Sequence, residues 1–187
     1  MKENTAERAS VWNDAARGGL VLGLVSIVYM VCTNLMEKIQ ASGVGAALLN
    51  VSEILLWVFK LYLCIRLMKF FMQRFAAGNE NATNKDTFCL GTATALLSAL
   101  IYSGFTLAWL LFFHPDMATE TMEAAVQMYE NVFTQDQLDT IREMAPRIPT
   151  ISFFVNLIWC WLFGTVLAAI FSRSIPSRNP FEETDNQ

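Results

Sequence analysis

Four long apolar segments separated by polar connections dominate the hydrophobic pattern of the chain. An α-helix rises about 1.5 Å per residue, so a run of about 20 apolar residues matches a hydrocarbon core about 30 Å thick. The pattern predicts an all-α, polytopic membrane protein with four transmembrane helices. The predicted spans cover about residues 18–36, 46–67, 88–113 and 151–171, within a transmembrane domain of residues 18–171 flanked by an N-terminal segment, 1–17, and a polar tail, 172–187.

The first span has a second interpretation, as the apolar region of a cleaved signal peptide. Arg17 precedes the run, and the small residues Ala41, Ser42 and Gly43 follow it. The apolar region of a signal peptide normally has about 7–15 residues, whereas this uncharged run has 19. We therefore expect a retained membrane span.

The second span is the one predicted to contain charged side chains. Glu53 and Lys60 lie within it, and each costs up to about 2.5–3.5 kcal/mol near the membrane centre on insertion scales. Its leucine, isoleucine, valine and phenylalanine residues gain about 0.3–0.6 kcal/mol each, which nearly cancels that cost. The third span has no charge, and the fourth carries one amide, Asn156. We expect the second span to insert together with its neighbours.

Lysine and arginine are distributed unevenly among the predicted connections. Nine lie in the N-terminal segment, in the second connection with its flank and in the tail, whereas the first and third connections together hold three. Positively charged short loops are retained in the cytoplasm. The distribution predicts that both termini lie on the cytoplasmic side.

The connection over residues 114–150 faces outward on this topology and contains two helical patterns. The first places apolar residues three to four positions apart, as on the buried face of an amphipathic helix: Met122, Val126, Tyr129 and Phe133. The second opens with a capping-box pattern, Thr134-x-x-Gln137, and places three apolar residues on one side: Leu138, Ile141 and Ala145. We expect an extramembrane amphipathic helical hairpin whose apolar faces are buried.

The same connection is acidic, with seven Asp or Glu residues against two arginines. Helices that lie on a membrane surface usually carry lysine and arginine on their polar face, because many lipid headgroups are anionic. We therefore expect the hairpin to pack on itself, on the ends of the spans or on a partner protein. A solvated acidic cap without a ligand is the simpler alternative.

Glu53 and Lys60 are the leading candidates for chemistry, because an ionisable group inside a span is a functional hypothesis by default. Seven residues return a helix to nearly the same face but separate the two Cα atoms by about 10.5 Å. Each side chain is therefore expected to find a partner on another helix or to extend toward the membrane interface. A structural role and ion or proton translocation both stay open. Asn156 is expected to form a hydrogen bond between helices.

Small residues four positions apart occur in every predicted span except the second. Such pairs let membrane helices approach each other closely. They favour a tightly packed bundle and leave a homo-oligomer open. The pairs are Gly19 with Gly23, Gly91 with Ala95, Gly104 with Ala108, and Gly164 with Ala168.

The chain offers no pattern of catalytic or metal-binding residues. Its four cysteines lie in or beside apolar runs without C-x-x-C spacing, and it has a single histidine, His114. A zinc site needs several such ligands grouped together. No basic stripe suggests nucleic acid, and only 16% of the residues are charged. We expect no catalytic site, no metal, no cofactor and no nucleic-acid partner for a chain surrounded by the lipid bilayer.

Four segments of the chain carry a family resemblance: Gly19 to Leu24, Phe88 with Gly91, Phe113 to Asp116, and Phe163 to Phe171. In these segments the chain resembles an uncharacterised family of four-helix inner-membrane proteins of Gram-negative bacteria, the domain of unknown function, family 4199. The resemblance covers nearly the whole chain and implies a location in the inner (cytoplasmic) membrane. Residues 77–84 depart from the glycine-rich, basic connection of similar proteins. Relatives are often encoded near a glycosyltransferase that resembles polyprenyl-phosphate sugar transferases, which implies a partner.

Two classes of function fit these observations. A non-catalytic scaffold or anchor for a partner membrane or envelope-biogenesis protein fits the missing catalytic pattern and the acidic outward segment. A small transporter or lipid-handling protein that uses Glu53 and Lys60 is the alternative. An intramembrane enzyme has the least support from the sequence.

Overall fold

The computed structural model describes residues 3–37, 39, 44–79, 82–129 and 132–175. Every regular element within these ranges is a helix, which confirms the all-α prediction, and four helices are long and apolar enough to cross a membrane. The elements in chain order are α1 (Glu3–Glu37), α2 (Val44–Gly78), α3 (Asn84–Ala108), the π-helical turn η1 (Trp109–Phe113), α4 (Met117–Tyr129), α5 (Gln135–Met144), the 3-10 turn η2 (Ala145–Arg147) and α6 (Ile148–Ser174).

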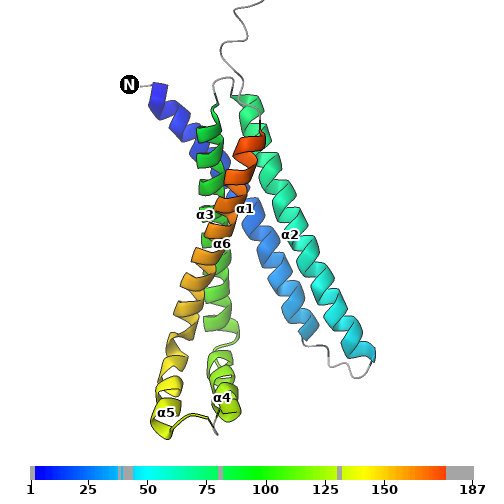
Figure 1. The fold of residues 1–187 in the computed structure, drawn as a ribbon, viewed down its shortest axis with the longest axis vertical. Helices are drawn as coiled ribbons and strands as arrows, with labels where there is room; N and C mark the ends of the chain where they lie inside the picture. The colour runs from blue at the N-terminus through cyan, green and yellow to red at the C-terminus, as the bar shows by residue number, and fades with distance from the viewer. Residues whose placement is uncertain (1–2, 38, 40–43, 80–81, 130–131, 176–187) are drawn as a thin grey trace, which may run out of the picture.

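The four long helices run alternately in opposite directions (Figure 1). The first part of α1, the end of α2, the start of α3 and the end of α6 meet at one end of the molecule. We call this the convergent end; buried residues from all four helices form its core: Ala15, Leu22, Met68, Met72, Phe75, Leu90, Ala93, Ala95 and Ala168. Towards the opposite end, α1 with α2 diverges from α3 with α6 (Figure 1).

The helix α3 lies at the centre of the bundle and packs most extensively against α1 and α6. Its start is fixed by a capping box in which the Asp86 carboxylate accepts hydrogen bonds from the Thr83 backbone N–H at 3.0 Å and from the Thr83 hydroxyl at 2.6 Å. The Thr83 hydroxyl in turn accepts a bond from the Asp86 backbone N–H at 3.3 Å. These bonds satisfy donors that a helix start otherwise leaves unpaired.

The helix α2 extends well beyond the apolar run from which the second span was predicted. It continues to Gly78, so Lys69 and Arg74 lie on the helix rather than in a connection. Apolar length marks where a helix can lie in lipid, but charged side chains do not end a helix, because they leave its backbone hydrogen bonds intact. The predicted N-terminal segment is likewise helical from Glu3 onward.

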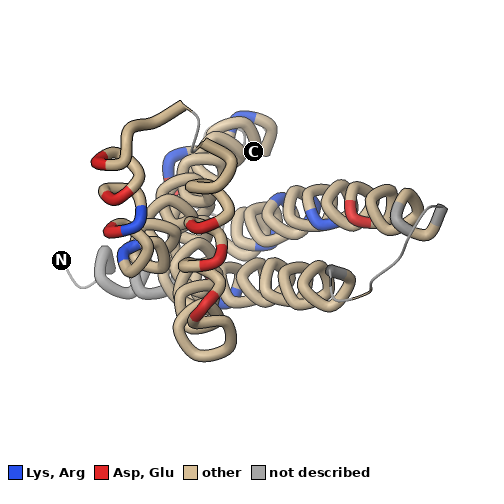
Figure 2. Tube along the Cα trace, turned by 90° about the horizontal axis from the view of Figure 1, so that it is seen from below, with Lys and Arg blue, Asp and Glu red and all other residues tan. Residues whose placement is uncertain are grey.

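The helices α4 and α5 lie side by side at the end opposite the convergent end, and acidic side chains follow both of them (Figure 2). Val126 and Leu138 are buried, as the apolar patterns predicted. Tyr129 and Phe133 are exposed, so the prediction of a buried stripe is wrong for these two residues. Phe133 lies beyond the end of α4 at Tyr129, so the helical spacing does not extend to it, whereas Tyr129 is the last residue of the helix.

Candidate ligand-binding cleft

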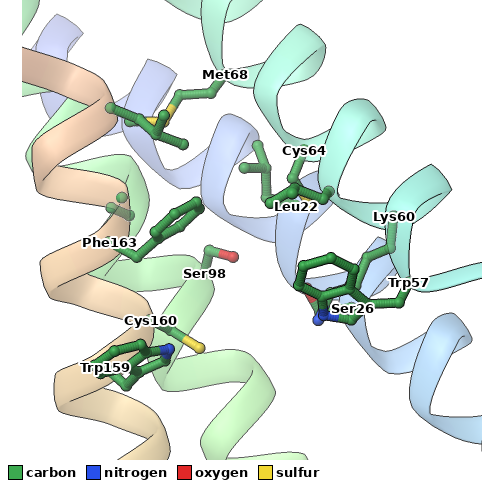
Figure 3. Close-up of a pocket in the computed structure, with 14 residues that line it drawn as sticks. Leu22, Ser26, Trp57, Lys60, Cys64, Met68, Ser98, Trp159, Cys160 and Phe163 are labelled. Carbon is green, nitrogen blue, oxygen red and sulfur yellow. The ribbon is translucent and has the colours of Figure 1, made fainter. Parts of the chain in front are cut away.

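A cavity of about 330 Å³ lies where the two helix pairs begin to diverge. Side chains from all four long helices line it, and we call it the cleft. Figure 3 shows Ser98 of α3 at its centre, between Phe163 of α6 on one side and Leu22 of α1 on the other. The cleft exists because α2 and α6 barely touch each other, whereas α3 packs closely on both α1 and α6.

Lys60 of α2 lines the cleft, and it is the one charged residue that does so. Its Nζ atom lies 4.8 Å from the ring centroid of Tyr29 on α1 and 5.2 Å from that of Tyr102 on α3. Each contact with a ring face stabilises an ammonium group by about 0.5–2 kcal/mol. Two rings from two other helices therefore hold the charge in place.

The Lys60 ammonium has no acidic partner within the described part of the chain. No carboxylate oxygen there lies within 4.0 Å of it. The rings contact the ammonium through their faces and leave its three N–H donors without an anionic acceptor. An anion bound in the cleft would supply such an acceptor.

The structure separates the other predicted polar residues from the cleft. Glu53 is half-buried on α2, is not among the lining residues and forms no ion pair with Lys60. Asn156 of α6 is half-buried, and its side chain forms no hydrogen bond with another described residue. Within the described part of the chain, the expected bond between helices is therefore not seen at Asn156.

The rest of the cleft wall is apolar with a few small polar groups. Trp57 of α2 and Trp159 of α6 are both exposed and flank the cleft (Figure 3). The hydroxyls of Ser26 and Ser98 are the neutral oxygen groups among the lining residues. Such a wall suits a hydrocarbon chain with one polar end, because few polar groups fix orientation and apolar groups supply most of the contact.

The residues that line the cleft do not include the groups that activate a nucleophile. Cys64 and Cys160 line it, but no histidine, aspartate or glutamate is among its lining residues to act as a base. His114 lies elsewhere, stacked on the Trp109 ring with their centroids 5.2 Å apart. Its Nδ1 atom has no hydrogen-bond partner in the described part of the chain. An activated nucleophile needs an adjacent base, and that base usually needs an orienting group.

Most of the predicted small residues lie at close helix contacts. A Cβ atom added to Gly19 would lie 2.7 Å from the Leu97 side chain of α3, and one added to Gly23 would lie 2.8 Å from Ile101. These distances are too short for any side chain larger than hydrogen. The helices α1 and α3 therefore approach each other along a strip that glycine alone keeps open.

The helix α6 approaches α3 in the same way. A Cβ atom on Gly91 of α3 would lie 2.7 Å from Ala168, and one on Gly164 would overlap Ala95. Gly104 differs, because a Cβ atom added there would meet no described atom within 4 Å. Among the described residues of this chain, Gly104 therefore lies at no close helix contact. Ala108 is half-buried.

The cleft itself was not predicted from the sequence, although two of its causes were visible. The second span was the one without a small-residue pair, and it was also the one that carried Lys60. A helix without small residues cannot approach its neighbours closely, so a gap beside it follows. The contacts with Tyr29 and Tyr102 had no sequence pattern that could have revealed them.

A scan against protein-family models matches residues 17–173 to one family, whose description is "Protein of unknown function (DUF4199)". The match covers all four long helices and the hairpin between α3 and α6. Searches of curated proteins and of solved structures give no match. The argument for function therefore rests on the cleft and on the surfaces of this chain.

Proposed function

The chain belongs to the family described as protein of unknown function, DUF4199, and we propose that it is a membrane protein that binds an amphiphile with one acidic group. The hydrocarbon part of the ligand occupies the cleft, and its acidic group pairs with Lys60. This is the lipid-handling alternative from the sequence, with Lys60 as the site residue and without Glu53.

The observation that carries the proposal is the placement of Lys60. An ammonium group at the wall of a mostly apolar cavity, held by two tyrosine rings and without an acidic partner nearby, suits a ligand with a negative charge. The volume of about 330 Å³ lies at the lower end of the range typical of ligand pockets, about 300–1,000 Å³. The gap between α2 and α6 supports entry from the lipid phase rather than from water.

The direct test is to purify the protein in mild detergent and to identify copurifying lipids by native mass spectrometry. We expect acidic amphiphiles to copurify with the wild type and to be at least about tenfold depleted in Lys60→Met, because a charge-assisted hydrogen bond contributes about 1.5–3 kcal/mol. Lys69→Met is the matched control, because Lys69 lies on the same helix but does not line the cleft. Equal depletion in both variants would contradict a specific role for Lys60.

A second variant tests the hydrocarbon part of the proposal. Ser98 points into the cleft from α3 (Figure 3), so Ser98→Phe would fill space that a hydrocarbon chain needs. We expect copurifying lipid to fall while the folded yield holds, because the added ring enters an existing cavity rather than a packed core. Unchanged lipid content in this variant would place the hydrocarbon elsewhere.

The orientation and the cellular membrane are part of the same proposal. We propose that the convergent end faces the cytoplasm of a bacterial inner membrane, since basic residues gather towards it: Arg17, Lys69, Arg74, Lys85 and Arg173. A reporter that works only in the cytoplasm should be active when fused after Gln187 and inactive when inserted near Glu130. Activity near Glu130 would reverse the orientation.

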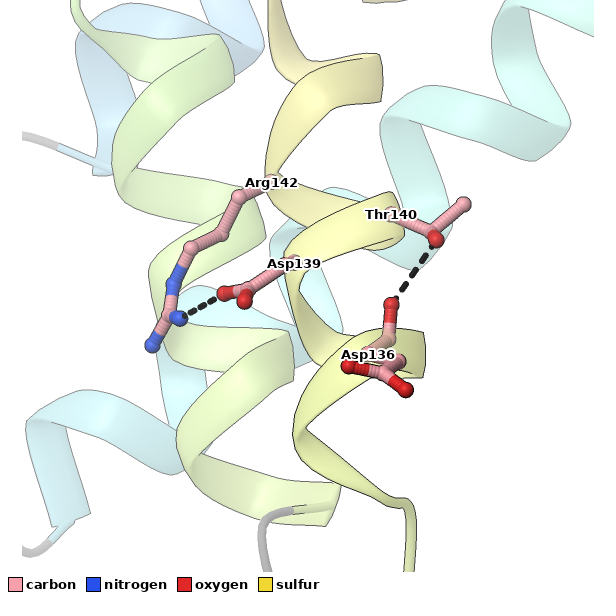
Figure 4. Close-up of polar contacts among 4 residues, drawn as sticks. All are labelled: Asp136, Asp139, Thr140 and Arg142. Carbon is pink, nitrogen blue, oxygen red and sulfur yellow. Dashed lines mark hydrogen bonds and ion pairs between the residues drawn. The ribbon is translucent and has the colours of Figure 1, made fainter.

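A second candidate function is an anchor for a partner protein, and the surface of the hairpin favours it. Exposed apolar residues lie at its tip: Met128, Tyr129, Val132 and Phe133. The ion pair of α5 is internal, with Arg142 2.7 Å from Asp139, and the Thr140 hydroxyl donates to the Asp136 carbonyl (Figure 4). An exposed apolar patch bordered by charge is typical of an interaction site.

The partner proposal has its own test in affinity purification. Val132→Asp combined with Phe133→Asp changes exposed residues, so we expect folding to hold while a stoichiometric partner protein is lost. Lys60→Met serves as the control and should retain that partner. A wild-type preparation without any stoichiometric partner would contradict the anchor function.

A further inference from the structure

A second hollow, of about 250 Å³, lies at the convergent end between α1 and α2. Asp14 and Arg17 line it from α1, and Arg74, Phe75 and Gly78 line it from α2. It shares no lining residue with the cleft. We call it the convergent-end hollow.

Two arginines from different helices, Arg17 and Arg74, line this hollow, and both residues are exposed. Among the residues whose side chains are described, from Val11 onward in α1, no carboxylate oxygen lies within 4.0 Å of Arg17 or Arg74, not even that of Asp14 in the same wall. The carboxylate of Asp86, at the same end, is occupied by its bonds to Thr83. The hollow therefore has two positive charges and one negative charge in its wall, and no ion pair joins them.

The remaining lining residues of the hollow leave space for a ligand. Phe75 is buried and forms a fixed apolar wall. A Cβ atom added to Gly78 would meet nothing within 4 Å. The Asn79 amide nitrogen donates one of its two N–H groups to the Phe75 carbonyl at 2.9 Å, which leaves the other for a ligand. The polar side chains along the hollow are thus the two arginines, this amide and the Asp14 carboxylate.

The position along the helices matches the level of lipid headgroups. Arg17 immediately precedes the apolar run of α1, and Arg74 lies two turns beyond the apolar run of α2 that ends near Leu67. Basic pockets between transmembrane helices at this level bind phosphate-bearing headgroups. The guanidinium fork matches the geometry of phosphate oxygens and can form two parallel hydrogen bonds.

We propose that the convergent-end hollow binds a phosphate group, and that Arg17 and Arg74 together hold it. Its level in the membrane favours a lipid headgroup as the source, and a free phosphate anion offers the same chemistry. The site is independent of the proposed function of the cleft, because the two share no lining residue.

The test uses the full chain in nanodiscs of phosphatidylcholine that contain a small fraction of phosphatidic acid. We expect native mass spectrometry to detect one retained phosphatidic acid per chain in the wild type. Arg17→Gln and Arg74→Gln should each weaken retention about tenfold, and the double variant should abolish it, since each loses a charged hydrogen bond. Retention by the double variant at the wild-type level would overturn the proposal.

Two controls separate a specific site from general attraction to a basic surface. Lys85→Gln removes a positive charge at the same end without touching the hollow, so retention should persist. The double variant Arg17→Lys with Arg74→Lys keeps both positive charges, which also help to set the orientation in the membrane. It loses the guanidinium groups that can form two parallel hydrogen bonds with a phosphate. We expect its retention to fall between those of the wild type and the glutamine variants. A lysine variant that retains as little lipid as the glutamine variants, yet unfolds at the wild-type temperature, still supports recognition by the fork.

A final measurement identifies the source of the phosphate. Inorganic phosphate is titrated against the protein in detergent and against the phosphatidic acid complex. Displacement of the lipid by millimolar phosphate would assign the site to a soluble anion, and persistence of the lipid would assign it to a headgroup. Binding of neither probe would overturn the proposal. Lys60→Met should leave the result unchanged, so failure of the cleft proposal remains distinguishable.

Discussion

The helices α2 and α3 are both long and apolar, but they differ in how much of their surface other helices cover. Most of α2 is exposed, whereas α3 packs against α1 on one side and α6 on the other. The most apolar stretch of α2 contains no buried residue. The helix α3, by contrast, buries residues along most of its length, including Leu90, Ala95, Ala99 and Ser103. Hydrophobicity alone therefore does not decide which helix of this bundle is buried.

The difference follows from side-chain size. Lipid tails are as apolar as leucine, so the association of helices in a membrane depends on close packing rather than on escape from water. Gly91 and Ala95 let α3 approach its neighbours, whereas α2 carries large side chains throughout its middle, including Trp57 and Phe59. The buried residues of α2, Met68, Met72 and Phe75, all lie in its last turns. The gap that remains beside Lys60 is the cleft.

The largest expected effect comes from breaking the close contact between α3 and α6. Gly164→Leu would place a branched side chain where even a Cβ atom overlaps Ala95. We expect a loss of about 1–3 kcal/mol of unfolding free energy, typical of overpacking a filled core. Unfolding in mixed micelles with increasing SDS, followed by circular dichroism, measures this loss.

Gly104→Leu is the matched control for that experiment. It makes the same change in α3 at a position where no described atom lies within 4 Å of the added Cβ. We expect a change within about 0.5 kcal/mol. Equal losses for the two variants would mean that the close contact at Gly164 is not the cause of the loss, since the higher helix propensity of leucine would stabilise both variants.

The sequence predicted the number and the apolar character of the helices, because each span has to satisfy its backbone within a bilayer and so carries a long apolar run. It predicted less well which residues face each other. Gly104 and Gly164 belong to the same kind of small-residue pair, but only Gly164 lies in a helix contact. Spacing assigns residues to a face, whereas the angle between helices decides which face meets a neighbour.

The residues of the cleft were harder to predict from the sequence than the helices, because tertiary structure brings them together. Lys60 stood out because it is an ionisable group within a span, but Glu53 stood out for the same reason and does not line the cleft. Tyr29 and Tyr102 lie on helices separated from α2 in the sequence, so no local pattern could assign them to Lys60. In the hairpin, spacing identified Val126 correctly but failed at Phe133, beyond the end of α4.

A smaller loss of unfolding free energy is expected near the end of α2, where the helix packs against its neighbours. It tests the difference between this packed end and the exposed middle of the same helix. Met72 is 1% exposed, so Met72→Ala would leave a cavity at the convergent end. We expect a loss of about 1–2 kcal/mol, below the about 2–5 kcal/mol of water-soluble cores, because lipid solvates the unfolded helix and only the packing contribution is lost. Thermal unfolding of the two proteins in the same detergent measures it. A loss below the error of the measurement would mean that α2 is not anchored at this end.

The smallest expected effect lies in the middle of α2, where Leu55 is 63% exposed. If this face meets only lipid, Leu55→Ala removes contacts with acyl chains and leaves no cavity, so the unfolding free energy should change by less than about 0.5 kcal/mol. Insertion could still weaken slightly, because a leucine contributes about 0.3–0.6 kcal/mol to a span that also carries Glu53 and Lys60. Unfolding measurements and the sedimentation of the detergent-solubilised protein distinguish a face that meets only lipid from a face that another helix covers. A loss above 1 kcal/mol, or a shift to a smaller sedimenting species, would mean that a second copy or a partner helix covers this face.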